Sequence, residues 1–312
     1  MTRSVSKEHD IDGDPRGAPG RGQVQRSATA EIVCAQRSAE TLRPAHRRLI
    51  DDPYAKYFLT KDAYRVLCST RVTAKLARTA FDRFYPGFMA IVLLRNLWYE
   101  ELLARSLAEG ITQVVLPGAG YDSTSLRLDL GGATLYEVDA PPTQEAKRNV
   151  IERNRLIVRN DVRYVSCDFE RESMLDNLRR NGFDPEAPTL IAWWGVSFFL
   201  TEDAVRRTVA DVTALTATGG RFVFDYLDPS VVGGSTTLPG AVRARGAVAK
   251  RGEPYRFGLT RDGAEDLIRS YGFVVEQNLS ITQLASLFGG ARGFPYSTDD
   301  FFGVITGKRE KR

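Results

Sequence analysis

The stretch that indicates the fold of this chain begins Gln113-Val-Val-Leu-Pro-Gly-Ala-Gly-Tyr-Asp122 and ends Thr134-Leu-Tyr-Glu-Val-Asp139. Val114 to Leu116 is a short apolar run stopped by proline and glycine, a pattern that predicts a strand buried on both faces. Gly118 and Gly120 then allow a sharp turn in which the backbone comes close to a ligand, because neither residue carries a Cβ. The stretch therefore predicts the ligand-binding end of a Rossmann-like sheet.

Two acidic residues close the second predicted strand of this stretch. Glu137 and Asp139 are two positions apart, so they are expected to point to the same side of that strand. Asp139 lies 21 positions after Gly118, close to the spacing of about 20 at which an acid meets a ribose hydroxyl. The pattern predicts a nucleoside-cofactor site formed by the bend and the strand tip: Gly118, Ala119, Gly120, Glu137 and Asp139.

The start of the next helix, expected over 123–130, indicates which nucleoside is bound. A dinucleotide fingerprint requires a third glycine where Ser123 stands. Asp122 lies at the helix start, where a carboxylate repels phosphate but can receive the ammonium of an amino acid. These residues favour S-adenosylmethionine. A nicotinamide (NAD(P)) cofactor on a related sheet is the alternative.

The residues that carry a family resemblance are Arg95, the run Gln113 to Leu128 and the block Tyr136-Glu-Val-Asp-Ala-Pro141. Together they resemble the leucine carboxyl methyltransferase family, in particular its bacterial branch of tetracenomycin-type polyketide carboxyl methyltransferases. The likeness extends from about 35 to 224 and is most specific over 118–141. It implies an α/β fold with the Rossmann-like, seven-stranded sheet of class I methyltransferases and an N-terminal helical lid. It also implies that Arg95 holds the carboxylate of S-adenosylmethionine, a task suited to a bidentate guanidinium.

The end of the third predicted strand, 162–167, supplies further cofactor-binding candidates. Cys167, Asp168 and Phe169 follow one another there, and in such a sheet the acid accepts the adenine amino group while the aromatic ring covers the base. Asp168 also matches an Asp-Leu motif of the resembling family. The alternative is that Asp168 only caps a helix over 171–180.

Trp194 marks a departure from the family pattern. The family usually has Glu-Gly-x-x-x-Tyr-Leu where this chain has Trp194-Gly-Val-Ser-Phe-Phe-Leu200. The change removes an acid that would contact the methionine ammonium or the acceptor, and it supplies a large apolar wall. We interpret it as a sign of an aromatic or otherwise hydrophobic acceptor, with a buried core tryptophan as the alternative.

The composition pattern predicts three regions. Residues 1–28 have almost no large apolar side chains and are expected to be a disordered leader. Helices expected over 30–42, 61–76 and 88–109 form a helical lid over 29–110. The remainder, 111–312, is the S-adenosylmethionine-binding core, with further strands at 189–194, 221–226, 273–276 and 301–306, the last two an antiparallel edge hairpin. A loop and helix insertion at about 228–258 is either a gate over the acceptor site or a solvated insertion.

Charge, cysteine and histidine usage exclude several other classes of protein. The net charge of +4 is too small to imply nucleic acid, and no apolar stretch near 20 residues or signal-like start is present, so a cytoplasmic, non-membrane enzyme is expected. The three cysteines are widely spaced and are expected to be reduced and mostly buried. His9 and His46 are the only histidines, which argues against a histidine-based metal site or serine triad; no metal is expected.

The expected reaction follows from the cofactor. A carboxylate acceptor is already ionised at neutral pH, so it requires alignment rather than a strong base. A phenol acceptor would require a base, and Tyr121, Asp225 and Tyr226 are candidates that the sequence does not rank. We therefore expect an S-adenosylmethionine-dependent O-methyltransferase acting on a carboxylate of a small hydrophobic or polyketide-like molecule. An NAD(P)-dependent oxidoreductase and a non-catalytic cofactor-binding protein are the alternatives.

Overall fold

The computed structural model describes residues 28–290 and 293–310, and the predicted leader lies outside them except for its last position. The described chain forms one seven-stranded sheet in the order β3-β2-β1-β4-β5-β7-β6. β1 to β5 pair in parallel, whereas β7 is antiparallel to both β5 and β6. The predicted seven-stranded α/β sheet is confirmed. Its strands are β1 Gln113–Pro117, β2 Thr134–Asp139, β3 Val162–Ser166, β4 Thr189–Trp193, β5 Arg221–Leu227, β6 Phe273–Ser280 and β7 Phe302–Arg309.

The antiparallel edge pair is not the hairpin expected from the sequence. β6 continues to Ser280, four residues past the predicted end, and helix α12 (Ile281–Phe288) follows it directly. Ser280 caps α12 in a capping box with Gln283. β6 and β7 are therefore joined by a helix and a loop rather than by a tight turn.

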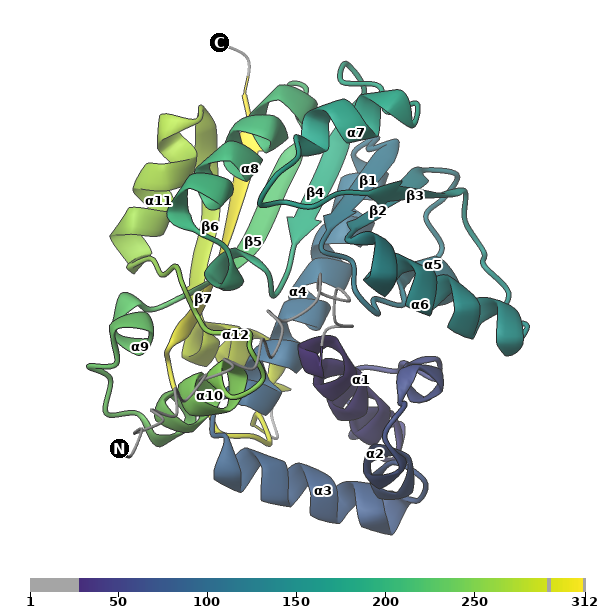
Figure 1. Ribbon diagram of the computed structural model, residues 1–312, viewed down its shortest axis with the longest axis vertical. Coiled ribbons are helices and arrows are strands. Elements are labelled where there is room, and N and C mark those ends of the chain that lie inside the picture. Colours follow the sequence, from purple (N-terminus) through teal and green to yellow (C-terminus); the bar gives the residue numbers. More distant parts are fainter. Residues whose placement is uncertain (1–27, 291–292, 311–312) are drawn as a thin grey trace, which may run out of the picture.

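Helices cover both faces of the sheet, as expected for strands that are apolar on both sides. Val114 and Leu116 belong to the cluster formed with α4 and α12, while Val115, between them, belongs to the cluster on the opposite face. Figure 1 shows α7, α8 and α11 in front of the sheet and α4 behind it. The covering helices are α4 Phe88–Ala108, α7 Met174–Arg180, α8 Glu202–Leu215 and α11 Arg261–Ser270; α5 Thr124–Arg127 and α6 Pro141–Arg153 flank β2 in the sequence.

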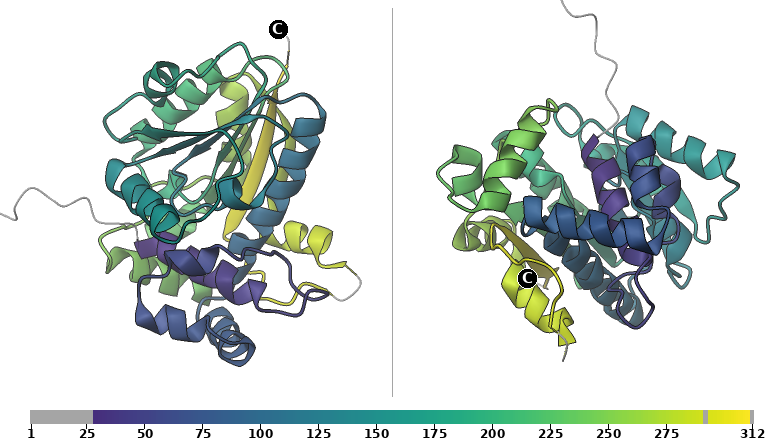
Figure 2. Two further views of the ribbon diagram at one scale, coloured as in Figure 1. Left: turned by 90° about the vertical axis from the view of Figure 1, so that its right-hand side faces the viewer. Right: turned by 90° about the horizontal axis from the view of Figure 1, so that it is seen from below.

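The N-terminal helices lie at the end of the sheet toward which the parallel strands point (Figures 1 and 2). They are α1 Ala28–Thr41, the 3-10 helix η1 Ala55–Phe58, α2 Asp62–Leu67 and α3 Arg71–Phe84. The prediction of a single helix over 61–76 is wrong, because α2 ends at Leu67 and a second helix, α3, begins after Thr70. The Thr70 side chain accepts from Thr73 N in a capping box. The last helix of this region, predicted over 88–109, is α4, which starts after Gly87 with its φ of +85°.

α4 connects the N-terminal helices to the core. Leu94, Trp98 and Leu102 are buried in the same cluster as side chains of β1, β4 and β5. At its other end, Phe88 and Arg95 line the cavity described below. α4 is thus part of the packed core as well as of the cavity wall.

The insertion after β5 contains two helices, α9 (Pro229–Gly233) and α10 (Pro239–Ala249). α10 packs on the turn before α4 so closely that a Cβ on Gly240 would lie 2.0 Å from the carbonyl oxygen of Pro86. Arg243 also donates to the carbonyl oxygen of Phe84 at the end of α3. The alternative of a merely solvated insertion does not hold for α10.

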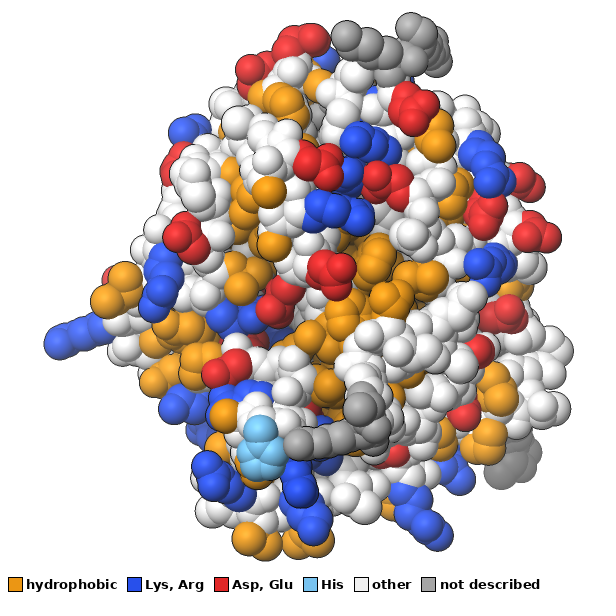
Figure 3. Space-filling view, turned by 180° about the vertical axis from the view of Figure 1, so that it is seen from behind, with side chains coloured by type: hydrophobic (Ala, Val, Ile, Leu, Met, Phe, Trp, Pro, Cys, Tyr) orange, Lys and Arg blue, Asp and Glu red, His pale blue; other side chains and the backbone are white. Residues whose placement is uncertain are grey.

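The surface carries charges of both signs. On the face shown in Figure 3, acidic and basic side chains are interspersed around a central band of hydrophobic side chains. This face therefore has no continuous basic surface of the kind that follows a phosphate backbone. Within 28–290 and 293–310, no helix has the length and apolar content needed to span a membrane.

Candidate active site

A cavity of about 650 Å³ lies at the carboxyl ends of β1, β2 and β4. Its size is within the range of about 300–1,000 Å³ that is typical of small-molecule sites. The cavity is lined by α1, the first half of α4, the loops that follow β1 to β4, and the segment 252–256. Among the candidates from the sequence, it is lined by Arg95, Gly118, Ala119, Gly120, Tyr121, Asp122, Asp139, Cys167, Asp168, Phe169 and Trp194.

The bend after β1 is held against the tip of β2. Gly118 and Gly120 have φ of +66° and +49°, and a Cβ on Gly118 would lie 2.2 Å from Val196 Cγ2. Asp139 Oδ2 accepts from Gly120 N at 2.5 Å, and Asp139 Oδ1 accepts from Ala140 N at 2.7 Å. Burial raises the pKa of Asp139, and these amide donors act against that shift. The strand tip thus presents a fixed carboxylate to the cavity.

Asp122 supplies a second carboxylate on the other side of the bend. Its Oδ1 accepts from Thr124 N at 2.7 Å, so it caps α5, which is shorter than the predicted helix over 123–130. Burial alone would raise the pKa of Asp122, but the nearby Lys147 and Arg37 cations and the Thr124 hydrogen bonds bring it below its ordinary value. An ionised carboxylate in this position suits a cationic group of a ligand.

Glu137 does not line the cavity, although it points to the same side of β2 as Asp139. It lies two residues deeper in the strand, where Lys147 Nζ of α6 is 2.6 Å from Glu137 Oε2 and both side chains are almost fully enclosed. Burial raises the pKa of Glu137, and Lys147 opposes that effect. The depth in the strand decides its place, because the side chain that accepts from the bend is that of Asp139, the last residue of β2.

Arg95 lines the cavity and is held from behind by Asp225. Arg95 Nη1 donates to Asp225 Oδ2 at 2.8 Å, and Asp225 Oδ1 accepts from Gly195 N at 2.7 Å. Asp225 is fully buried, which raises its pKa, while the Arg95 guanidinium lowers it. Asp225 of β5 therefore links α4 to the turn that follows β4, and it does not line the cavity.

The other two candidate bases lie in different surroundings. Tyr226 follows Asp225 in β5 and so faces the opposite side of the sheet, where its hydroxyl donates to Asn278 Oδ1 at 2.7 Å. Tyr121 lines the cavity, and its ring stacks on Phe58 with centroids 5.2 Å apart. Of the three candidates, only Tyr121 lies at the cavity.

The end of β3 is placed as the spacing predicts. Cys167, Asp168 and Phe169 all line the cavity. The alternative that Asp168 caps the next helix is wrong, because α7 begins at Met174 and is capped by Ser173, whose Oγ accepts from Asp176 N. Asp168 instead accepts from Glu170 N at 3.0 Å in a short turn at the cavity rim.

The thiols give a direct check on this packing. Cys34 and Cys167 are fully buried, and burial raises their pKa to about 12 and about 11. We expect that at pH 8 a disulfide-exchange reagent such as dithionitrobenzoate modifies at most Cys68, which is half-buried, in the folded protein. All three should react in guanidinium chloride; prompt reaction of three thiols in the native protein would contradict the described burial.

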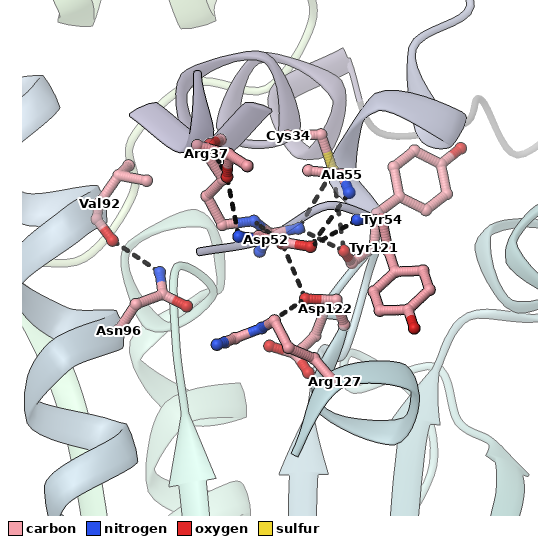
Figure 4. A network of polar contacts seen from close by, with 12 residues as sticks. Cys34, Arg37, Asp52, Tyr54, Ala55, Val92, Asn96, Tyr121, Asp122 and Arg127 are labelled. Carbon is pink, nitrogen blue, oxygen red and sulfur yellow. Dashed lines mark hydrogen bonds and ion pairs between the residues drawn. The ribbon is translucent and has the colours of Figure 1, made fainter. Parts of the chain in front are cut away.

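A buried ion pair at the cavity was not anticipated from the sequence. Arg37 of α1 lines the cavity, donates to the carbonyl oxygen of Tyr121 at 2.6 Å and pairs with Asp52 at 3.0 Å (Figure 4). Ser123 Oγ donates to the same Asp52 carboxylate at 2.7 Å. Asp52 also accepts from Ala55 N, the first residue of η1, at 3.1 Å. Arg37 and Asp52 hold α1 on the glycine bend.

An aromatic wall closes the side of the cavity that lies beyond β4. Trp194 lines the cavity and meets Tyr99 edge to face, with centroids 6.5 Å apart. The fully buried core tryptophan is its neighbour Trp193. The other aromatic rings of this wall are Phe88, Phe198, Phe199, Tyr255 and Phe302.

The strand order, the glycine bend after β1 and the acid at the tip of β2 define a class I S-adenosylmethionine-dependent methyltransferase. A crystal structure of a DUF574 family protein from Streptomyces avermitilis shares the fold, with a TM-score of 0.58 over 87% of this chain and 99% of that chain at 16% identity. The chain belongs to the leucine carboxyl methyltransferase family, whose model matches residues 30–213.

Relatives by sequence carry the same assignment. A Mycobacterium marinum protein named "Putative S-adenosyl-L-methionine-dependent methyltransferase" is 31% identical over 66% of this chain and 67% of its own length. A Frankia alni protein with a name of the same form is 34% identical over 64% of this chain and 69% of its own. A Mycolicibacterium smegmatis relative is 29% identical over 80% and 82%. The protein is an S-adenosylmethionine-dependent methyltransferase rather than the NAD(P)-dependent oxidoreductase considered as an alternative.

Proposed function

We propose that this methyltransferase methylates a carboxylate oxygen of a small hydrophobic molecule, a class that includes polyketide acids of the tetracenomycin type. The observation that carries the proposal is a cavity with an aromatic wall and without a histidine. The one histidine in the described ranges, His46, is exposed and lies outside the cavity lining. Among the described residues, no group of three or more His, Cys, Asp or Glu side chains could hold a metal ion.

The cavity residues fit the cofactor. Three of the carboxylates that line the cavity belong to Asp122, Asp139 and Asp168, and each of these accepts only one or two hydrogen bonds from the protein in the described structure. Their remaining lone pairs suit the ammonium, the ribose hydroxyls and the adenine amino group. Phe169 would cover the base, and the Arg95 guanidinium would hold the carboxylate.

A carboxylate acceptor suits these surroundings better than a phenol. When bound, S-adenosylmethionine supplies a methyl group on a sulfonium, and a carboxylate can accept that methyl without losing a proton. A phenol requires a base, but Asp225 is engaged by Arg95 and Gly195, and Tyr226 faces the other side of the sheet. Tyr121 lies at the cavity, but its own phenol would have to lose a proton before it could act as a base. A reaction that needs only the alignment of an already ionised acceptor is therefore consistent with the residues at the cavity.

The test is a transfer assay with S-adenosylmethionine labelled in the methyl group. We expect label in aromatic carboxylic acids, and we expect mild alkali to release it as methanol because the product is a methyl ester. Phenols of the same ring size serve as the matched acceptors, since their methyl ethers withstand alkali. Label that appears only in phenols, or that resists alkali, would overturn the proposal.

A further inference from the structure

Tyr255 has a hydroxyl that the described protein leaves without a partner. Its side chain is only 8% exposed and lines the cavity. Within 28–290 and 293–310, its hydroxyl forms no hydrogen bond and is not among the fully enclosed polar atoms, so it opens into the cavity, whereas the Tyr226 hydroxyl bonds to Asn278. A hydroxyl that opens into a ligand-sized cavity and bonds to none of the described residues is available to a ligand, which can supply the partner.

The ring of Tyr255 is held in a fixed position. It packs edge to face on Phe198 with centroids 5.5 Å apart and lies 5.4 Å from the ring of Phe199. The next residue, Arg256, donates its amide to the carbonyl oxygen of Phe198 at 2.8 Å and pairs with Glu170 at 3.1 Å. Thr29 of α1 donates to Glu253 at 2.6 Å on the other side. The hydroxyl is therefore preorganised.

Tyr255 is packed on the β4 side of the cavity, whereas the proposed ribose acid Asp139 lies at the tip of β2. Asp139 and Asp168 follow β2 and β3, whereas Phe198 and Phe199, which hold Tyr255, follow β4. In the sheet β4 is separated from β2 by β1 and from β3 by two strands. Burial and the Asp225 carboxylate both raise the pKa of Tyr255, so its phenol stays protonated and can donate at neutral pH.

We infer that Tyr255 recognises the methyl acceptor by donating a hydrogen bond to its carboxylate, and that the acceptor is a flat aromatic acid. This inference rests on the proposed function. A carboxylate only accepts hydrogen bonds, so it complements a donor that has no protein partner. The rings of Phe88, Phe198, Phe199 and Phe302 lie on the same side of the cavity and offer faces and edges to a planar ring system. Tyr255 is thus a specificity-determining residue.

The test compares the wild-type protein with Tyr255→Phe, using 2-naphthoate as the probe. The substitution removes only an unpaired hydroxyl, so the melting temperature and S-adenosylmethionine affinity should be unchanged. We expect 2-naphthoate affinity, measured on protein saturated with S-adenosylhomocysteine, and kcat/KM for ester formation to fall about 10- to 100-fold. Tyr164→Phe is the matched control, because Tyr164 is on β3, outside the cavity lining, and should leave both values unchanged.

The outcomes separate this inference from the proposed function. Weaker binding by Tyr255→Phe without ester formation by the wild type would support the recognition role and overturn carboxylate methylation. Equal ester formation by both proteins would support carboxylate methylation and overturn the role of Tyr255. Equal affinity of the two proteins for 2-naphthoate, or no binding by the wild type, would also overturn the inference.

Discussion

Replacing Lys147 by methionine should lower the free energy of unfolding by about 3–5 kcal/mol, the usual cost of leaving one partner of a buried ion pair alone. Lys147 Nζ lies 2.6 Å from Glu137 Oε2, with side-chain exposures of 1% and 2%. Methionine has a similar length and fills the space, so the loss reflects charge rather than a cavity. Urea or guanidinium unfolding of the two proteins measures the difference.

The pH dependence of this loss has a definite sign. Burial raises the folded-state pKa of Glu137, and removing Lys147 raises it further. For an acid with a raised folded pKa, the folded state binds the proton more tightly, so stability is greatest below the unfolded pKa of about 4.3 and falls as pH rises through the folded pKa. The Lys147→Met protein should therefore lose more stability at pH 8 than at pH 4.

A second substitution distinguishes the ion pair from simple packing. Glu137→Gln in the Lys147→Met background removes the unpaired charge and should restore most of the lost stability. The double-mutant cycle then gives a coupling energy between the two positions. Equal stability of wild type and Lys147→Met at pH 8 would contradict a charged, buried pair.

The sheet was predictable because its signals are local. The apolar run Val114 to Leu116, the two glycines and the acid that follows 21 positions after Gly118 all lie within one β-α-β unit. β1, β4 and β5 are buried throughout and carry short apolar runs, whereas β3 and β6 are partly exposed, and the seven-stranded sheet was expected from the family resemblance. Element ends were less exact, because Thr70 and Ser280 act through capping contacts that the hydrophobic pattern does not record.

The parts of the site that were not predictable depend on contacts between distant segments. Arg37 reaches Tyr121, which is 84 positions away, and nothing in either segment indicates the other. Asp225 and Tyr226 are equivalent as candidates in the sequence, yet the alternation of β5 places them on opposite faces. Tyr255 lies in the insertion predicted at about 228–258, and it stands out only because its hydroxyl faces the cavity and bonds to none of the described residues.

Replacing Asp139 by alanine should weaken S-adenosylmethionine binding by about 1–3 kcal/mol, or roughly 5- to 150-fold, because charged hydrogen bonds to the ribose would be lost. The same change removes the acceptor for Gly120 N, so it also releases the bend. Asp139→Asn retains an amide oxygen for Gly120 but not the charge, and should lie between wild type and Asp139→Ala. Isothermal titration with S-adenosylmethionine measures all three.

Arg95→Ala provides an independent measurement at the other end of the same ligand, and a loss of about 1–3 kcal/mol is expected there as well. Asp161→Asn is the matched acidic control, since Asp161 is exposed and outside the cavity lining. Unchanged affinity in both Asp139→Ala and Arg95→Ala would mean that the cofactor does not bind between β2 and α4. If only Asp139→Ala lost affinity, the carboxylate of S-adenosylmethionine would instead be assigned to Arg37, whose guanidinium also lines the cavity near the bend.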